Sequence, residues 1–116
     1  MRKFVLSASC ALVFVALCHG AAAAQSGAPR VAKVEPPSWW AGHSINPVRL
    51  LVRGSNLHGV RVSADVGAPF ELSGQSVNPA GTYIFVNLRI DARAVPGEYK
   101  LRFQSSAGSV THPFVI

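Results

Sequence analysis

Cysteine is almost absent from this sequence of 116 residues. Its two cysteines, Cys10 and Cys18, both lie within the first 24 residues. Residues 25–116 therefore contain no thiol, which excludes disulfides, thiol nucleophiles and thiolate metal sites from this part of the chain. A domain of this size must then fold on its apolar core alone.

Patterns of catalytic and metal-binding residues are also lacking. Beyond residue 24, His43, His58 and His112 stand alone, without the close spacing of a zinc motif. The five carboxylates are isolated in the sequence, and neither a G-x-S-x-G elbow nor a Gly-rich phosphate loop is present. A domain this small also offers no obvious cleft for a pair of catalytic carboxylates. We expect no enzymatic activity, no catalytic residue, no metal and no cofactor.

Long apolar runs are lacking, with one exception at the N-terminus. Arg2 and Lys3 precede the apolar segment 4–17, which is too short to cross a bilayer as a stable helix. The small residues that follow include Ala22-Ala23-Ala24, a suitable signal-peptidase site. We expect residues 1–24 to be a signal peptide that directs export to the periplasm or the extracellular space.

The segment after the expected cleavage site is small and polar. Residues 25–30 (Gln-Ser-Gly-Ala-Pro-Arg) are expected to form a flexible leader, with no membrane span left after cleavage. Two alternatives are a retained N-terminal anchor and a lipoprotein signal at Cys18. Leu17 disfavours the second, because a lipobox has a small residue before its cysteine.

Acidic residues are few, which leaves the chain basic. Nine of the eleven Lys and Arg residues follow residue 24, together with all five acids, so the net charge of residues 25–116 is +4. These charges lie singly between apolar residues, as on the solvated face of a sheet, and form no basic cluster. We therefore expect no nucleic-acid partner.

The sequence beyond residue 30 predicts short β-strands separated by Gly, Pro, Asn and Ser. The expected strands are 31–35, 48–53, 60–66, 70–72, 75–77, 82–90, 98–103 and 109–115. Seven or eight short strands with turn signals at intervals of about 8 to 12 residues are typical of an immunoglobulin-like sandwich. We predict an all-β fold for residues 31–116, an immunoglobulin-like (E-set) β-sandwich of about seven strands without a disulfide. Pro113 predicts that the last strand lies at a sheet edge or carries a bulge.

The strand 82–90 has the clearest alternation. Its even positions from Ile84 to Ile90 are aliphatic and form one face, which we expect to lie in the core. Tyr83 and Phe85 then point outward, with Asn87 and Arg89 continuing their row. Aromatic rings beside amide and guanidinium donors suit a sugar or a partner protein. The alternative is that the other sheet or a loop covers them.

Both tryptophans of the chain are adjacent. Trp39 and Trp40 lie between Pro36-Pro37 and Gly42. We expect at least one of them to close the open end of the sandwich as an apolar lid. An exposed tryptophan beside His43 would be a sugar platform or a docking anchor. Together with Tyr83 and Phe85, these three residues form the candidate ligand or partner surface.

The same residues carry a family resemblance. The run VEPPSWWAG at 34–42 and the run NPVRLLVRGSNL at 46–57 resemble the N-terminal domain of bacterial cyclomaltodextrinases and neopullulanases. The strand at 83–88 and the turn at 94–97 resemble that domain less specifically. The resemblance implies an immunoglobulin-like module that packs against a catalytic (β/α)8 barrel and helps dimerisation or substrate access. By this resemblance, that role falls on Trp39, Trp40, Tyr83 and Phe85.

The resemblance carries over no hydrolase activity, because the family's catalytic carboxylates lie in the barrel and this sequence ends at Ile116. We expect a non-catalytic module that binds an α-glucan or a partner protein and that can form a homodimer. A weaker likeness to IPT/TIG domains at 52–57 and 96–101 implies a structural or adhesion module instead. A third interpretation is that the chain is a truncated remnant of a longer hydrolase.

Overall fold

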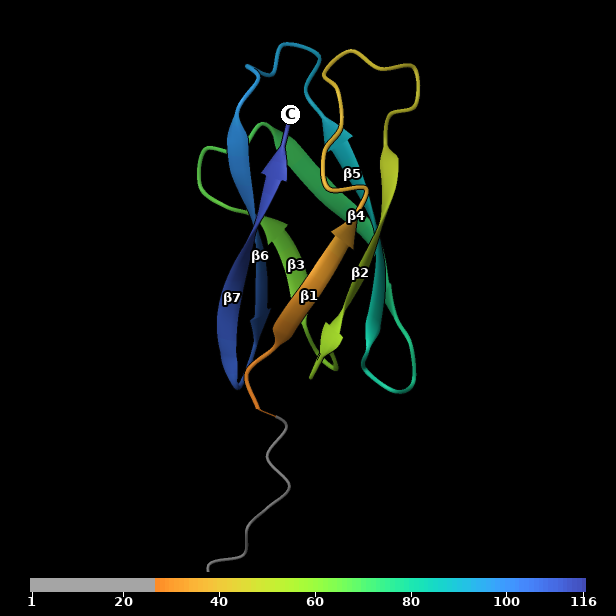
Figure 1. Ribbon diagram of the computed structural model, residues 1–116, viewed down its shortest axis with the longest axis vertical. Helices are drawn as coiled ribbons and strands as arrows, with labels where there is room; N and C mark the ends of the chain where they lie inside the picture. Colours follow the sequence, from red (N-terminus) through yellow and green to blue (C-terminus); the bar gives the residue numbers. More distant parts are fainter. Residues whose placement is uncertain (1–26) are drawn as a thin grey trace, which may run out of the picture.

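The computed structural model describes residues 27–116 (Figure 1). The expected signal peptide, 1–24, and the first part of the expected leader lie outside the described residues. Strand β1 begins at Arg30, where the expected leader ends. Within residues 27–116, no helix has the length and apolar character needed to cross a membrane.

The fold consists of two antiparallel sheets packed face to face. The strands are β1 (Arg30–Glu35), β2 (Val48–Ser55), β3 (Arg61–Ala64), β4 (Phe70–Val77), β5 (Tyr83–Ile90), β6 (Glu98–Ser105) and β7 (Gly108–Val115). The first sheet has the order β1-β2-β5-β4 and the second the order β3-β6-β7 (Figure 1). The predicted all-β sandwich is confirmed, and its strand order is consistent with the immunoglobulin-like assignment.

Strict alternation along the strands builds the core. Successive side chains of a strand point to opposite faces, so every second residue of each strand meets the facing sheet. On β5 the predicted aliphatic face, Ile84 to Ile90, is buried to 2% exposure or less. Leu101 and Phe103 on β6 and Phe114 on β7 face it from the second sheet, each fully buried. Each such side chain contributes about 1.5–3 kcal/mol relative to an exposed one.

Strand β3 is shorter than its sequence pattern predicts. The alternation of 60–66 predicts a strand through Val66, but the strand ends at Ala64. Asp65 opens a turn in which its carbonyl accepts a hydrogen bond from Ala68 N–H at 3.0 Å. Val66 consequently lies on a loop with 99% of its surface exposed.

Strand β4 joins the two short segments predicted at 70–72 and 75–77. Its register against β5 shifts between Ser73 and Ser76, and Gly74 lies there at φ 60°. This bulge brings the Gln75 side chain to the edge of the second sheet. Gln75 Nε2 donates to the carbonyl of Val60, and Gln75 Oε1 accepts from Val62 N–H at 3.0 Å. One open side of the sandwich, between β3 and β4, is therefore bridged by a side-chain amide.

The other open side is bridged by the backbone after β1. Ser38 pairs in parallel with Val115 of β7, and Trp39 N–H donates to the Val115 carbonyl at 3.0 Å. The chain thus passes from the first sheet to the second before the loop turns back to β2. Strand β7 is the edge strand of its sheet, which confirms the prediction from Pro113.

The loops 36–47, 65–69 and 91–97 share one end of the sandwich with Ile116, and we call it the C-terminal end (Figure 1). Asn46 fastens the loop 36–47 to β5 there. Its Nδ2 donates to the Ile90 carbonyl at 2.9 Å, and its Oδ1 accepts from Ile90 N–H at 3.0 Å. The side-chain amide therefore satisfies both backbone groups of the last residue of β5.

An ion pair joins β6 to the turn after β3. Arg102 Nη2 lies 3.0 Å from Asp65 Oδ1. The pKa of Asp65 is lowered below its ordinary value, chiefly because Arg102 donates a hydrogen bond to the carboxylate and secondly because Val66 N–H does. The carboxylate is thus held in its charged form in the folded protein.

Asn46→Ala is expected to lower the free energy of unfolding by about 1–3 kcal/mol, because both Ile90 backbone groups lose their partner. Urea denaturation measures the change. Asn87→Ala is the matched control, since Asn87 accepts its hydrogen bond from exposed Arg49, and we expect it to stay within about 0.5 kcal/mol of wild type. Equal stability of the Asn46 variant and wild type would contradict this account of the loop.

Arg102→Gln is expected to raise the pKa of Asp65, as measured by a carboxyl NMR titration. A lowered folded pKa stabilises the fold above the unfolded value of about 3.9, and this stabilisation is lost as the pH falls through the folded pKa. The stability difference between wild type and Arg102→Gln should therefore vanish at acid pH. Arg61→Gln is the control and should leave the Asp65 titration unchanged. If the pKa of Asp65 is unchanged in the Arg102 variant, Arg102 is not the cause of its lowering.

Candidate functional site

Three of the candidate residues form one aromatic cluster in the loop 36–47. The ring centroids of Trp39 and Trp40 are 5.3 Å apart, and those of Trp39 and His43 are 4.8 Å apart. The rings of Trp40 and His43 are stacked, with centroids 5.5 Å apart and an interplanar angle of 25°. Trp39 is half-buried and packs against the core, whereas Trp40 is 65% exposed. We call these three side chains the tryptophan cluster.

Hydrogen bonds inside the loop hold the tryptophan cluster together. Trp39 Nε1–H donates to the Ile45 carbonyl at 2.9 Å, and Ile45 N–H donates to His43 Nδ1 at 2.9 Å. Gly42, at φ 71°, provides the left-handed turn that brings His43 back toward the tryptophans. Because Nδ1 accepts, the neutral imidazole carries its proton on Nε2, where it can act as a donor.

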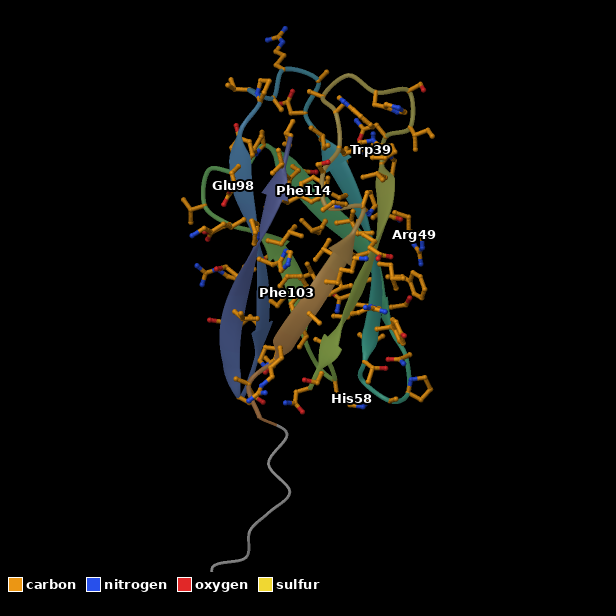
Figure 2. All side chains as sticks on the ribbon, viewed as in Figure 1. Trp39, Arg49, His58, Glu98, Phe103 and Phe114 are labelled. Atoms are coloured by element: carbon orange, nitrogen blue, oxygen red, sulfur yellow. The ribbon has the colours of Figure 1, made fainter. Side chains whose placement is uncertain are left out.

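The loop that carries the cluster has no formal charge. Residues 36–47 include no Asp, Glu, Lys or Arg. The exposed Trp40 ring is therefore a flat apolar surface with the polar imidazole of His43 stacked beside it. Such a surface suits an uncharged ligand with an apolar face, because no fixed charge must be desolvated on binding. Figure 2 shows Trp39 in the upper part of the sandwich, at the end that carries this loop.

Tyr83 and Phe85 lie on the outer face of the first sheet, as the alternation of β5 predicts. They are 39% and 41% exposed. Phe85 is paired with Leu51 of β2, and Tyr83 is paired with Arg53. The Arg49 guanidinium lies 5.4 Å from the centroid of the Phe85 ring (Figure 2 labels Arg49). Tyr83 and Phe85, which we call the aromatic strip, thus lie beside arginines of the neighbouring strand.

The two sets of candidate residues belong to different parts of the surface. Tyr83 opens β5 at the end opposite the loop 36–47, whereas Asn46 binds the last residue of β5. A strand of eight residues spans about 24 Å at roughly 3.4 Å per residue. The structure therefore unites Trp39, Trp40 and His43 and leaves Tyr83 and Phe85 as a separate surface.

The arginines beside Tyr83 and Phe85 are not predicted from the sequence. Arg49 and Arg53 are scattered charges in the sequence, and their position beside Phe85 and Tyr83 follows from the pairing of β2 with β5. The alternation of β2 places both on the solvent face, but only the register shows which residues they oppose.

One carboxylate near the arginines of this face is already paired. Glu35 on β1 forms an ion pair with Lys33. The pKa of Glu35 is lowered, chiefly by the hydrogen bond from Lys33, then by the charge of Lys33 and, as a smaller cause, by the charge of Arg53. Among residues 27–116, no group of three His, Cys, Asp or Glu side chains is placed to bind a metal ion.

The chain was compared with known proteins and with models of protein families. No curated protein matches the chain significantly. A family model described as "Cyclomaltodextrinase, N-terminal" matches residues 33–116, from the middle of β1 to the last residue. The match includes the whole tryptophan cluster and the whole aromatic strip, and it confirms the resemblance found in the sequence. The chain therefore belongs to the cyclomaltodextrinase N-terminal domain family.

Proposed function

We propose that this protein is a non-catalytic module of carbohydrate metabolism that binds an α-glucan through the tryptophan cluster. The observation that carries the proposal is the exposed Trp40 ring, stacked on His43 and backed by Trp39. The family supports the ligand class, since the matched domain is named for an enzyme that acts on cyclic maltodextrins. Export by the expected signal peptide, 1–24, is part of the proposal.

The chemistry of the cluster suits an uncharged sugar. A pyranose ring has an apolar C–H face that packs on an indole ring, and its hydroxyls need neutral donors and acceptors at the rim. Trp40 offers the ring, while the His43 imidazole offers a polar group beside it. Trp39 holds the platform in place, because it is anchored both to the core and to Ile45.

The same loop argues for binding without catalysis. Glycoside hydrolysis uses a pair of carboxylic acids beside the scissile bond. Residues 36–47 contain no Asp or Glu, so a glucan stacked on Trp40 meets no carboxylic acid and no carboxylate nucleophile from this loop. The proposed role is to hold or guide the substrate of a hydrolase.

A maltoheptaose titration is expected to shift the tryptophan fluorescence of the wild-type protein. Trp40→Ala is expected to weaken binding by at least about tenfold, or 1.4 kcal/mol, in isothermal titration calorimetry, because it removes the stacking surface. Its unfolding midpoint should stay near wild type, since most of the Trp40 side chain is exposed.

Tyr83→Ala is the matched control for this experiment. It removes an exposed aromatic ring from the outer face of the first sheet, so the affinity for maltoheptaose should be unchanged. Absence of a fluorescence shift at millimolar maltoheptaose would contradict the glucan proposal. An equal loss of affinity for maltoheptaose in Trp40→Ala and Tyr83→Ala would also contradict it.

Docking of a partner protein is a second candidate function, favoured by the exposed apolar side chains at the C-terminal end. Trp40, Ile45, Val66 and Val95 are 65%, 56%, 99% and 69% exposed, and all four lie on loops of that end. Exposed apolar groups at one end of a domain favour a protein contact there. A second copy of the chain is one such partner.

For this second function, the wild-type protein should self-associate in light scattering as its concentration rises. Replacing Val66 and Val95 together by serine is expected to weaken that association, because it removes apolar contact area. Both side chains lie outside the core, so the unfolding midpoint of the double variant should match wild type. A wild-type monomer at every concentration would exclude the homodimer.

A further inference from the structure

A hollow lies at the end of the first sheet that is remote from the tryptophan cluster. It has a volume of about 450 Å³, and its walls come from β1, β2 and the start of β5. The lining residues are Arg30, Val31, Ala32, Arg53, Gly54, Ser55, Thr82 and Tyr83. The hollow therefore adjoins the aromatic strip and has no part in the function proposed above.

The backbone of β1 and β2 shapes this hollow. The register between the two strands shifts between Val31 and Lys33, so Ala32 lies in a bulge of β1. Gly54 of β2 packs directly under β1, because a Cβ atom there would lie 1.9 Å from the carbonyl oxygen of Arg30. Glycine at position 54 thus allows the backbone of β1 to lie close to β2, and the bulge at Ala32 interrupts the regular pairing beside Arg30 and Arg53.

The charge of the lining has one sign. Arg30 and Arg53 are its charged residues, and none of the lining residues is acidic. The carboxylate of Glu35, farther along β1, is already paired with Lys33. A guanidinium group presents paired N–H donors that match a carboxylate or a phosphate. Two arginines without an acid among the lining residues therefore favour an anionic group in the hollow.

The neutral part of the lining is rich in hydroxyl groups. Ser55, Thr82 and Tyr83 each supply one, and Tyr83 also supplies an aromatic ring that is 39% exposed. Thr82 Oγ1 accepts a hydrogen bond from Asn78 Nδ2 at 2.8 Å, so its own proton is directed elsewhere. Hydroxyl groups beside an aromatic ring suit the hydroxyls and the C–H face of a sugar.

We propose that this hollow binds a saccharide that carries a carboxylate or a phosphate group. Arg30 and Arg53 hold the anionic group, Tyr83 packs against the sugar ring, and Ser55 and Thr82 bond its hydroxyls. The volume lies within the range of small-ligand sites, about 300–1,000 Å³. A longer anionic chain would continue over Phe85 toward Arg49, which already lies over that ring.

The site is tested on the whole domain with four probes: glucuronate, glucose 1-phosphate, glucose and inorganic phosphate. Heteronuclear NMR follows the side-chain Nε–H of Arg53 and the backbone N–H of Tyr83. Glucuronate and glucose 1-phosphate are expected to shift these signals in a saturable way that weakens with added salt. Glucose should shift them little, and inorganic phosphate should bind more weakly than glucose 1-phosphate.

Arg53→Gln is expected to weaken glucuronate binding by about tenfold or more, because it removes a charged donor pair. Arg61→Gln is the matched control, since Arg61 starts β3 of the other sheet and should leave the affinity unchanged. Trp40→Ala should also leave it unchanged, which separates this site from the glucan proposal. Thermal unfolding of each variant verifies that the fold is kept.

Three results would overturn the proposal. The first is an absence of saturable shifts with both anionic sugars. The second is an equal loss of affinity in Arg53→Gln and Arg61→Gln, which would indicate attraction by net charge alone. The third is inorganic phosphate binding as tightly as glucose 1-phosphate, which would indicate an anion site that does not recognise the sugar.

Discussion

The contact between the apolar faces of the two sheets stabilises everything else in this domain. Residues 25–116 contain no cysteine, so no covalent cross-link assists the burial of Ile84, Leu101 and Phe103. A hydrophobic contact is non-directional, and by itself it would not fix how the sheets are aligned or keep their edges closed. The hydrogen bonds across the two open sides supply that direction. One side is bridged by the backbone at Trp39 and the other by the Gln75 side chain.

Apolar burial together with these hydrogen bonds explains how a loop of twelve residues can hold the exposed Trp40 ring in a fixed position. The loop 36–47 begins where the chain crosses from the first sheet to β7 and ends where Asn46 binds the backbone of Ile90. Between these anchors, the Trp39 side chain packs on the core and bonds Ile45. An exposed ring such as Trp40 loses little conformational freedom on binding when its support is already ordered, which favours recognition by stacking.

This small sandwich has two surfaces of different electrostatic character, one uncharged and one basic. The tryptophan cluster lies on an uncharged loop at the C-terminal end, and the arginine-lined hollow lies at the other end of the first sheet. The two proposed ligands, one neutral and one anionic, would not compete, because their sites lie toward opposite ends of β5. Membership of the cyclomaltodextrinase N-terminal domain family links the chain to carbohydrate chemistry.

The sequence by itself determined the fold class, the inward face of β5 and the outward direction of Tyr83 and Phe85. Side-chain alternation is a local property of an extended chain, so it can be read before any pairing is known. Tertiary structure alone decided that Arg53 lies opposite Tyr83, that Gln75 bridges β4 to β3, and that His43 stacks on Trp40. These neighbours depend on strand register and on turns at bulges and glycines, which are set by long-range packing of the whole chain.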